Sequence, residues 1–387
     1  MASPRPAAVR TDGSNAFAHH SMAVRVPAII QETLDRNPDY PASIQKALAA
    51  LKHAIEKDAP LHLFDPPTPD YDLWADRFAP HQGETWLDTE WIFCEALAYR
   101  LMLTATRYWD TGRDPFRPFK EEEMASAALW EALGAALAVE GKVEERLAAR
   151  LAMTLWGNRI DLSIKQAAEQ GVHAHKDHLL TDHLPKAVAH LIRHPPGDVH
   201  VIMDNAGTEQ ALDYALVDLL LEDDLAETVT LHVKLTPVLV GNANVPDVHR
   251  LLGLMHARGG AAAALASRLY RHLDTGRLRV VPDFFWSTAG RLWELPPRLR
   301  AALEGARLVL LKGDFNYRRA TNDAIWPPDV SLSDAFRDFP APLLALRTPK
   351  CDTLVGVSRE IIERLDAEAK PGWRTSGTYG VAQFATF

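Results

Sequence analysis

The sequence predicts an α/β protein in which a mostly parallel sheet is flanked by helices and preceded by an N-terminal helical bundle. Two observations predict this class. Residues 25–195 carry helical periodicity without a convincing strand, whereas short apolar runs alternate with helical segments from residue 196 onward. Such alternation is typical of βαβ units, whose strands pair in parallel. The length of 387 residues is sufficient for two domains, or for one large α/β unit with an extra layer.

The helical signals of the first half lie in three stretches. Ser43 can cap a helix whose apolar residues recur at steps of three and four, so that they share one face: Ile44, Leu48, Leu51 and Ile55. Residues 86–103 form a second helical stretch, and residues 121–155 are rich in Ala, Leu and Glu, which are strong helix formers. We therefore expect a helical N-terminal domain over residues 25–195.

The second half carries short apolar runs that predict strands. The first five runs are residues 199–203, 228–233, 278–281, 308–311 and 343–346. A sixth run, residues 381–384, is expected as an edge strand. The pattern changes at Pro195-Pro196-Gly197, so we expect an α/β domain over residues 196–387. Residues 1–24 mix Pro, Ala, Ser, Gly and His without periodicity, and we expect a disordered tail there.

Composition excludes several classes of protein. A net charge of −9 argues against a nucleic-acid partner, because such proteins need a basic face. Two cysteines, Cys94 and Cys351, cannot form a disulfide framework, and this usage fits a reducing compartment. No apolar run approaches the roughly 20 residues that span a bilayer, and the N-terminus lacks a signal-peptide core. We therefore expect a cytoplasmic protein without a membrane partner.

Polar clusters close three of the predicted strands, at the edge where an open α/β sheet binds its ligands. They are Asp204-Asn205, the group Lys312-Gly313-Asp314 with Asn316, Tyr317 and Arg318, and Arg347-Thr348-Pro349-Lys350. Asp and Asn oxygens suit Mg²⁺ or Mn²⁺, and Arg and Lys bind phosphoryl groups. The pattern therefore predicts a site for a divalent cation and a small anionic phosphorylated substrate. No G-x-x-x-x-G-K-[ST] loop and no G-x-G-x-x-G turn is present.

These strings resemble the damage-control phosphatase family, formerly called domain of unknown function 89. The resemblance is carried by Asp204-Asn205-Ala206-Gly207-x-Glu209, Lys312-Gly313-Asp314-x-Asn316-Tyr317-Arg318 and Arg347-Thr348-x-Lys350. Further agreement lies in Leu155-Trp156-Gly157-Asn158 with Asp161-Leu162-Ser163, and in Trp91, Glu95, Tyr99 and Arg100. The chain is most similar to the Arg-Thr-x-Lys branch, which includes the acidic-residue methyltransferase 1-like proteins. The similarity runs from about residue 25 to the C-terminus.

The resemblance implies a helical bundle on a Rossmann-like domain, and hydrolysis of phosphate monoesters such as sugar phosphates with Mn²⁺, Mg²⁺, Ni²⁺ or Co²⁺. The family's metal ligands carry over onto Asp204 and Asn205, with Asp204 also catalytic. The residues expected to bind substrate are Arg347, Thr348, Lys350, Asn316 and, from the helical part, Glu95. Asp314 is expected to act as an acid, a base or a water-positioning group.

Two positions depart from the family's pattern. The third metal ligand of the family is an Asp, and the matching position here is Asn242. An Asn carbonyl can coordinate a cation, but the loss of one charge is expected to weaken the site by about 1.5–3 kcal/mol. The family's substrate-facing Lys near the C-terminus is replaced by Thr378. Both changes point to an altered substrate or an altered reaction.

Three alternatives to a metal-dependent phosphatase remain open at this stage. The same site could serve a different phosphoryl or pyrophosphoryl reaction, as a transferase or a lyase in a specialised pathway. An S-adenosylmethionine-dependent carboxyl methyltransferase is an activity attributed to part of the family, although no glycine-rich cofactor loop follows the first strand. A binding protein without catalytic activity is the third.

Overall fold

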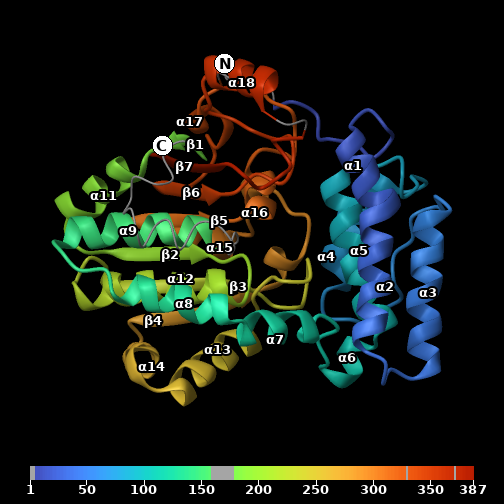
Figure 1. Cartoon of the computed structure of the whole chain (residues 1–387). Coiled ribbons are helices and arrows are strands. Elements are labelled where there is room, and N and C mark those ends of the chain that lie inside the picture. Colours follow the sequence, from blue (N-terminus) through green and yellow to red (C-terminus); the bar gives the residue numbers. More distant parts are fainter. Residues whose placement is uncertain (1–4, 158–177, 328–329, 370–371) are drawn as a thin grey trace.

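A seven-stranded sheet forms the centre of the α/β part of the chain in a computed structural model (Figure 1), which describes residues 5–157, 178–327, 330–369 and 372–387. Its strands are β1 Leu179–Asp182, β2 Asp198–Ile202, β3 Thr228–Lys234, β4 Leu278–Asp283, β5 Leu308–Lys312, β6 Leu343–Arg347 and β7 Gly380–Ala385. They lie in the order β1-β7-β6-β5-β2-β3-β4, and every neighbouring pair is parallel except β6 and β7. The predicted α/β class with a mostly parallel sheet is confirmed.

The first five predicted strands are present as β2 to β6, but the last predicted strand was wrongly expected at an edge. The run at residues 381–384 became β7, which lies between β1 and β6. The edge strands are β4 and β1, and β1 lies in a region where we expected no strand. Its four residues alternate between buried and partly exposed, and only Leu179 and Leu180 are apolar. So short a signal cannot be distinguished from a turn in the sequence.

Both faces of the sheet are buried, because successive side chains of each strand point to opposite sides. Val199 and Val201 of β2 pack in one cluster with helices α8, α9, α11, α12 and α14, whereas Ile202 packs in the other cluster. The helices that follow the N-terminal layer are α7 Arg117–Ala125, α8 Ala127–Leu137, α9 Val143–Trp156, α11 Leu184–Arg193, α12 Thr208–Glu222, α13 Val245–Arg258, α14 Gly260–Asp274, α15 Pro297–Leu303, α16 Asp314–Ala320, α17 Leu332–Ala335 and α18 Arg359–Glu368.

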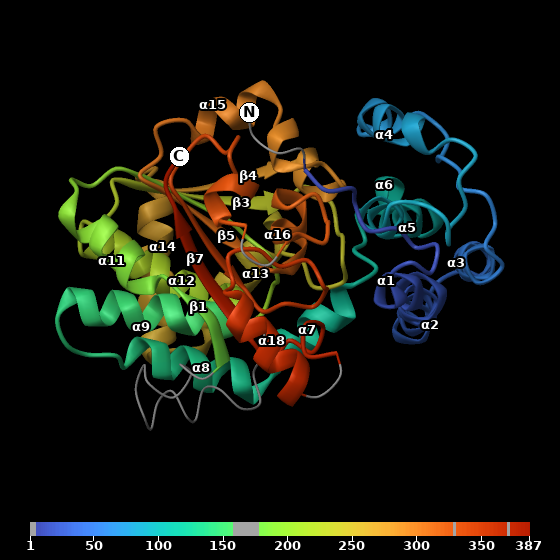
Figure 2. The same cartoon turned by 90° about the horizontal axis from the view of Figure 1, so that it is seen from above.

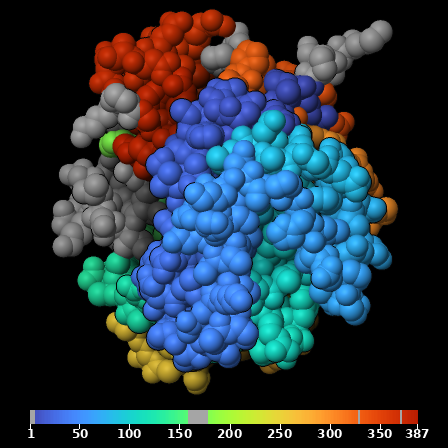
Figure 3. Space-filling view, turned by 90° about the vertical axis from the view of Figure 1, so that its right-hand side faces the viewer, coloured from blue at the N-terminus to red at the C-terminus, as the bar shows by residue number. Residues whose placement is uncertain are grey.

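The N-terminal helices form a separate layer beside the α/β part, as Figures 1 and 3 show. They are α1 Ala16–His20, α2 Val26–Arg36, α3 Ala42–Glu56, α4 Tyr71–Phe78, α5 Trp91–Ala105 and α6 Tyr108–Thr111, with a π-helical turn at Ser21–Arg25. The predicted apolar stripe of residues 44–55 is buried in the core of this layer. We call these helices the helical layer.

The structure divides the chain at another place than the expected boundary at residues 195 and 196. Helices α8, α9 and α11 precede that boundary, yet α9 and α11 pack against the sheet and α8 packs on α12, and Figure 2 shows all three away from the helical layer. Residues 5–24, which we expected in a disordered tail, contain α1 and most of the π-helical turn. Val9 donates a backbone hydrogen bond to Asp323 at 2.8 Å, which joins this segment to the α/β part.

Two further observations concern the length of the helices and the motif residues that the structure does not describe. None of the helices in the described ranges is long and apolar enough to cross a membrane. Asn158 and the string Asp161-Leu162-Ser163, which contributed to the family resemblance, lie outside the described residues.

Candidate functional site

The strand order reverses between β2 and β5, and the polar clusters of the sequence meet at this point. Chain connections run from β2 outward to β3 and β4 on one side, and through β5 and β6 on the other. Such a switch point leaves a crevice beyond the carboxyl ends of the strands. A cavity of about 150 Å³ lies there. It is lined by Arg25, Trp91, Glu95, Tyr99, Asp204, Asn205, Leu239, Asn242, Asp314, Phe315, Arg318 and Lys350.

The three expected metal ligands come together at one wall of this cavity. The Nδ2 of Asn242 donates to Asp204 Oδ1 and to Asn205 Oδ1, at 3.1 Å in each case. The Nδ2 of Asn205 donates to Asp204 Oδ2, also at 3.1 Å. The Oδ1 of Asn242 is buried and has no hydrogen-bond partner. One carboxylate and two amide groups therefore form a single cluster, in which one carbonyl oxygen is left unsatisfied.

Backbone contacts hold the two loops of this cluster against each other. Ala206 N donates to Gly241 O at 2.7 Å, and Ala243 N donates to Asp204 O at 2.8 Å. Leu239 and Val240, just before this pairing, both adopt positive φ, 51° and 56°. The left-handed region costs about 1–3 kcal/mol for each residue other than glycine. It is most unfavourable for a β-branched side chain such as that of Val240. The surrounding contacts therefore impose this loop conformation, as is common at functional sites.

Asp204 lies in surroundings that oppose its negative charge. Burial and the nearby Glu209 raise the pKa of Asp204 to about 7. A Cβ atom added to Gly313 would lie 2.0 Å from Asp204 Oδ2, so the backbone of the β5–α16 turn packs directly on the carboxylate. The φ of Gly313 is +83°, which also requires glycine. A nearby positive charge would stabilise the ionised form of Asp204.

A buried ionic network stabilises the cluster of Asp204, Asn205 and Asn242. Lys312 Nζ lies 2.8 Å from Glu209 Oε1 and 3.1 Å from Asp213 Oδ1, and it also donates to Thr154 O at 2.8 Å. The other oxygen of Glu209 accepts from Asn205 Nδ2 at 3.2 Å. Burial opposes the charge of Lys312, but Asp213 and Glu209 raise its pKa overall. Lys312 is thus a structural cation that fixes Glu209, and Glu209 orients the Asn205 amide.

Asp314 and Lys350 line the same cavity. Asp314 Oδ1 accepts from Arg347 Nε at 2.7 Å and from the backbone N of Lys350 at 2.9 Å. Burial opposes the charge of Asp314, but attraction to Arg347 and Arg318 lowers its pKa overall. Asp314 is therefore ionised at neutral pH, and its Oδ2 makes no hydrogen bond within the described part of the chain. The Lys350 side chain lines the cavity.

Three residues that we expected to bind substrate lie behind the cavity wall. Arg347 is 1% exposed, and it donates to Asp314, to Thr353 O at 2.5 Å and to Cys351 Sγ at 3.1 Å. Asn316 is fully buried, and its Nδ2 donates to Met203 O at 3.2 Å and Lys312 O at 2.9 Å. Thr348 is also buried and does not line the cavity. In this geometry these groups support the site without reaching its interior.

The helical layer supplies the wall that faces the sheet. Glu95 of α5 accepts from Arg25 of the π-helical turn and from Arg318 of α16, at 2.6 Å in each case. Arg318 is held in addition by Asp323 at 2.8 Å, and its guanidinium lies 3.7 Å from the centroid of the Trp91 ring. The side chain of Arg25 is 45% exposed. Glu95 thus lines the cavity, and its carboxylate connects Arg25 with Arg318.

Several lining residues were not expected as site residues. Arg25, Leu239 and Phe315 line the cavity, and no motif in the sequence pointed to Arg25 or Leu239. Trp91, Tyr99 and Arg318 belong to strings that carried the family resemblance, and that was the available signal. Arg100, from the same string as Tyr99, instead forms a buried ion pair with Asp70 at 2.5 Å.

The side chains at the cluster fit a hard divalent cation. No group of three His, Cys, Asp or Glu residues able to hold a metal ion occurs within the described ranges, so a cation here depends on amide oxygens. The cluster supplies the Asp204 carboxylate, the Asn205 carbonyl and the unsatisfied carbonyl of Asn242, an oxygen-only set that suits Mg²⁺ or Mn²⁺. In the structure, Asn242 directs its Nδ2 toward the other two residues, so its amide would turn to coordinate.

The fold and the position of the site define an α/β protein with a ligand cavity at a topological switch point. Comparison with protein families matches residues 21–365 to the damage-control phosphatase ARMT1-like domain. The chain therefore belongs to the damage-control phosphatase ARMT1-like family. The resemblance inferred from the sequence motifs is confirmed.

Individual relatives are similar over nearly their whole length. The protein named damage-control phosphatase ARMT1 of Bos taurus is 26% identical over 442 aligned positions, which cover 99% of each chain. The proteins of the same name from Rattus norvegicus and Homo sapiens are 27% and 24% identical, with 98% of each chain covered. Membership of this family supports a phosphatase that acts on a small phosphorylated metabolite.

A solved structure shares the fold. The crystal structure of a DUF89 family protein from Pyrococcus horikoshii has a TM-score of 0.50 and 17% sequence identity, and the match covers 94% of this chain and 97% of that one. At this identity the likeness bears on the fold alone. It agrees with the sheet and helices described above.

Proposed function

We propose that this protein is a divalent-metal-dependent phosphatase that hydrolyses the ester of a small phosphorylated metabolite such as a sugar phosphate. The observation that carries the proposal is the convergence of Asp204, Asn205 and Asn242 with Asp314 and Lys350 in one cavity at the switch point. These residues come from four different loops, so their meeting is a property of the fold. Damage-control phosphatase membership supports the same reaction class.

Asp204, Asn205 and Asn242 would hold the cation through their side-chain oxygens. Mn²⁺, Mg²⁺, Ni²⁺ or Co²⁺ bound there supplies positive charge that stabilises a phosphoryl group in transfer and lowers the pKa of a bound water. The chain prepares this wall by packing Gly313 on Asp204 and by holding Asn205 through Glu209. The requirement for positive charge beside Asp204 follows from the raised pKa of that group.

Lys350 would bind the phosphate as a point charge, since it lines the same cavity as the cluster. Asp314 is ionised, so it can accept a proton or orient a water through Oδ2, but it cannot begin the reaction as an acid. Arg347 would act indirectly, because its guanidinium holds Asp314 Oδ1 from a buried position. In this view Arg347 is a positioning residue, while Glu95 and Arg25 would contact the remainder of the substrate.

A second candidate keeps the site and changes the reaction to a different phosphoryl or pyrophosphoryl transfer or a lyase step. One observation favours it: Asn242 donates N–H groups to Asp204 and Asn205, where an Asp could only have accepted. The turn that carries Thr378 lies next to Lys350, because a Cβ on Gly377 would be 3.9 Å from Lys350 Cε. Both departures from the family pattern therefore lie at or beside the cavity.

The proposed function is tested with purified protein, Mn²⁺ and a panel of sugar phosphates, with release of inorganic phosphate as the readout. Asp204→Ala should lower turnover at least about 1,000-fold, because it removes the only carboxylate of the cluster. Asp198→Ala is the matched control, since Asp198 is an exposed residue at the opposite end of the same strand. Full turnover in Asp204→Ala would contradict the assignment. Gain of sugar phosphatase activity in Asn242→Asp with Thr378→Lys would favour the second candidate.

A further inference from the structure

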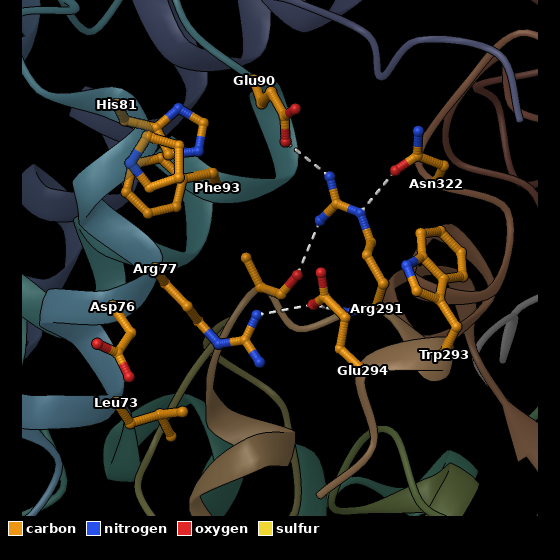
Figure 4. Close-up of a pocket in the computed structure, with 12 residues that line it drawn as sticks. Leu73, Asp76, Arg77, His81, Glu90, Phe93, Arg291, Trp293, Glu294 and Asn322 are labelled. Carbon is orange, nitrogen blue, oxygen red and sulfur yellow. Dashed lines mark hydrogen bonds and ion pairs between the residues drawn. The ribbon is translucent and has the colours of Figure 1, made fainter.

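A second, larger cavity lies between the helical layer and the α/β part, and Figure 4 shows its interior. Its volume is about 460 Å³, within the range of roughly 300–1,000 Å³ that is typical of small-molecule sites. The charged or polar groups that line it are Asp76, Arg77, His81, Glu90, Arg291, Glu294 and Asn322, together with Phe93 and Trp293. None of these residues lines the candidate phosphatase site.

Opposite charges are paired across this cavity between the two parts of the chain. Arg77 of α4 donates to Glu294 at 2.9 Å, and Arg291 donates to Glu90, next to α5, at 2.8 Å (Figure 4). Each nitrogen of the Arg291 guanidinium has a partner, since it also donates to Ala289 O at 2.8 Å and to Asn322 Oδ1 at 3.0 Å. Arg291 therefore fixes the wall of the cavity.

The other charged groups retain capacity for a ligand. Arg77 donates to Glu294 through Nη1 alone within the described residues, so the N–H groups of its Nη2 remain for a ligand, whereas its Nε has no exposed surface. The side chains of Glu294 and Glu90 are 43% and 35% exposed, so their carboxylates can accept further hydrogen bonds. The cavity thus offers an available cationic donor and accessible anionic acceptors within one space. A ligand with a single charge would be attracted by one set and repelled by the other.

An apolar surface completes the site. The ring of His81 is stacked on Phe93, with 3.8 Å between the centroids and 13° between the planes. His81 Nδ1 is engaged with Glu84 Oε2 at 2.7 Å, which fixes the orientation of the ring. Figure 4 shows this stacked pair beside the Arg77–Glu294 and Arg291–Glu90 ion pairs. A flat apolar side chain of a ligand could pack here while its charged groups meet the ion pairs.

The two cavities share no lining residue. Glu90 and Phe93 line the second cavity, whereas Trp91 and Glu95 line the candidate phosphatase site. Glu90 directly precedes α5, and the other three residues lie in its first turns. The second cavity is thus separate from the catalytic one, and the same helix serves both.

We propose that this cavity is a binding site for an α-amino acid or a closely related small zwitterion with an apolar side chain. The ligand carboxylate is placed at Arg77 Nη2, and the ammonium at the exposed oxygens of Glu294 and Glu90. The side chain packs on the Phe93–His81 pair. Such a molecule carries both charges a short distance apart, which matches the alternation of charge on the cavity wall.

Calorimetric titration of the full chain with L-phenylalanine tests the proposal. We expect saturable 1:1 binding, and binding at least about tenfold weaker for N-acetyl-L-phenylalanine and for phenethylamine, which each retain only one of the two charges. Arg77→Met and Glu294→Gln should each weaken the binding of L-phenylalanine about tenfold or more. L-Leucine should bind as well, whereas D-glucose 6-phosphate should not compete for this site.

The control is Arg113→Met, because Arg113 also forms an ion pair, with Asp39 at 2.6 Å, but does not line this cavity. Its affinity for L-phenylalanine should equal that of the unaltered chain. Absence of saturable heat up to about 10 mM would overturn the proposal, as would equal binding of the single-charge analogues. Unchanged affinity in Glu294→Gln would also overturn it, and this variant decides the case if Arg77→Met does not fold.

Discussion

The two walls of the candidate phosphatase site are built in different ways. The sheet wall, with Asp204, Asn205, Asn242 and Asp314, is held by short backbone bonds between loops and by buried ionic groups. The helical wall presents Arg25, which is 45% exposed and joined to the sheet side through Glu95 and Arg318. Rigid placement is what reacting groups need, and adjustable side chains suit recognition of variable substrates. We therefore expect the chemistry to depend on the sheet wall and the choice of substrate on the helical wall.

The largest expected effect tests the ionic support of the sheet wall. Lys312→Met leaves Glu209 and Asp213 buried without their cation, and breaking a buried pair in this way costs about 3–5 kcal/mol of stability. Urea unfolding should show this loss. Lys52→Met is the control, since Lys52 is a partly exposed residue of the helical layer. A loss below about 1 kcal/mol would mean that the sheet wall is not held by this network.

Gly313→Ala tests the geometry of the same wall. The added Cβ would lie 2.0 Å from Asp204 Oδ2, so either the carboxylate or the turn must move. A shift of about 1 Å at a reacting group can lower turnover about 100-fold, and we expect that loss in phosphate release. Gly253→Ala, in α13, has no atom within 4 Å of the new Cβ and should retain turnover. Equal activity of the two variants would show that the wall is less rigid than inferred.

Acid should destabilise the folded chain through a buried histidine pair in the sheet. His200 Nδ1 lies 2.9 Å from His232 Nε2 on neighbouring strands, and burial lowers the pKa of His232 to about 3. The folded chain keeps His232 neutral while the unfolded chain binds a proton below about pH 6.5, so stability present above that pH is lost as the pH falls. We expect a loss of about 2 kcal/mol between pH 7 and pH 5.

Unfolding curves at both pH values measure this loss, and His232→Gln should reduce it. His249→Gln, at an exposed position of α13, should leave the pH dependence unchanged. The same pH dependence in His232→Gln would assign it to other groups.

The variant Asn242→Asp tests whether the cluster in the sheet wall binds the cation. The second carboxylate should increase affinity for Mn²⁺ about tenfold, as expected for one more charged ligand. Equilibrium dialysis of Mn²⁺ measures this without reference to turnover. Asn244→Asp is the control, because Asn244 caps α13 on the same loop and does not line the cavity. Unchanged Mn²⁺ affinity in Asn242→Asp would place the cation away from this cluster.

The smallest effect is expected on the helical wall. Arg25→Met should raise KM about threefold to fivefold with little change in kcat, because exposed ion pairs contribute about 1 kcal/mol or less. Glu95 retains Arg318 as its partner, so stability should be nearly unchanged. Steady-state kinetics on several phosphate esters measures the split between KM and kcat. A fall in kcat as large as that of Gly313→Ala would contradict the division of roles between the two walls.

Much of the site was predictable from sequence because its residues follow buried strands. Asp204, Asn205, Asp314 and Lys350 stand at the ends of apolar runs, and parallel strands bring such ends to one edge. Asn242 was found through the family's pattern, since no local signal marks its loop. Arg25 had no signal at all, because a single arginine within an apolar helical segment looks like any residue on the exposed face of a helix. The roles of these residues stay predictions until the measurements above are made.

The sequence by itself determined the α/β class, strands β2 to β6 and the strand-end motifs, because burial and periodicity are local properties of a chain. Only the tertiary structure decided that β1 is an edge strand, that Arg347 lies behind Asp314, and that Arg25 reaches the cavity. These features depend on contacts between segments far apart in the chain. Arg347 illustrates the reason: whether an arginine holds a substrate or a neighbouring carboxylate depends on which partner the fold brings within hydrogen-bond distance.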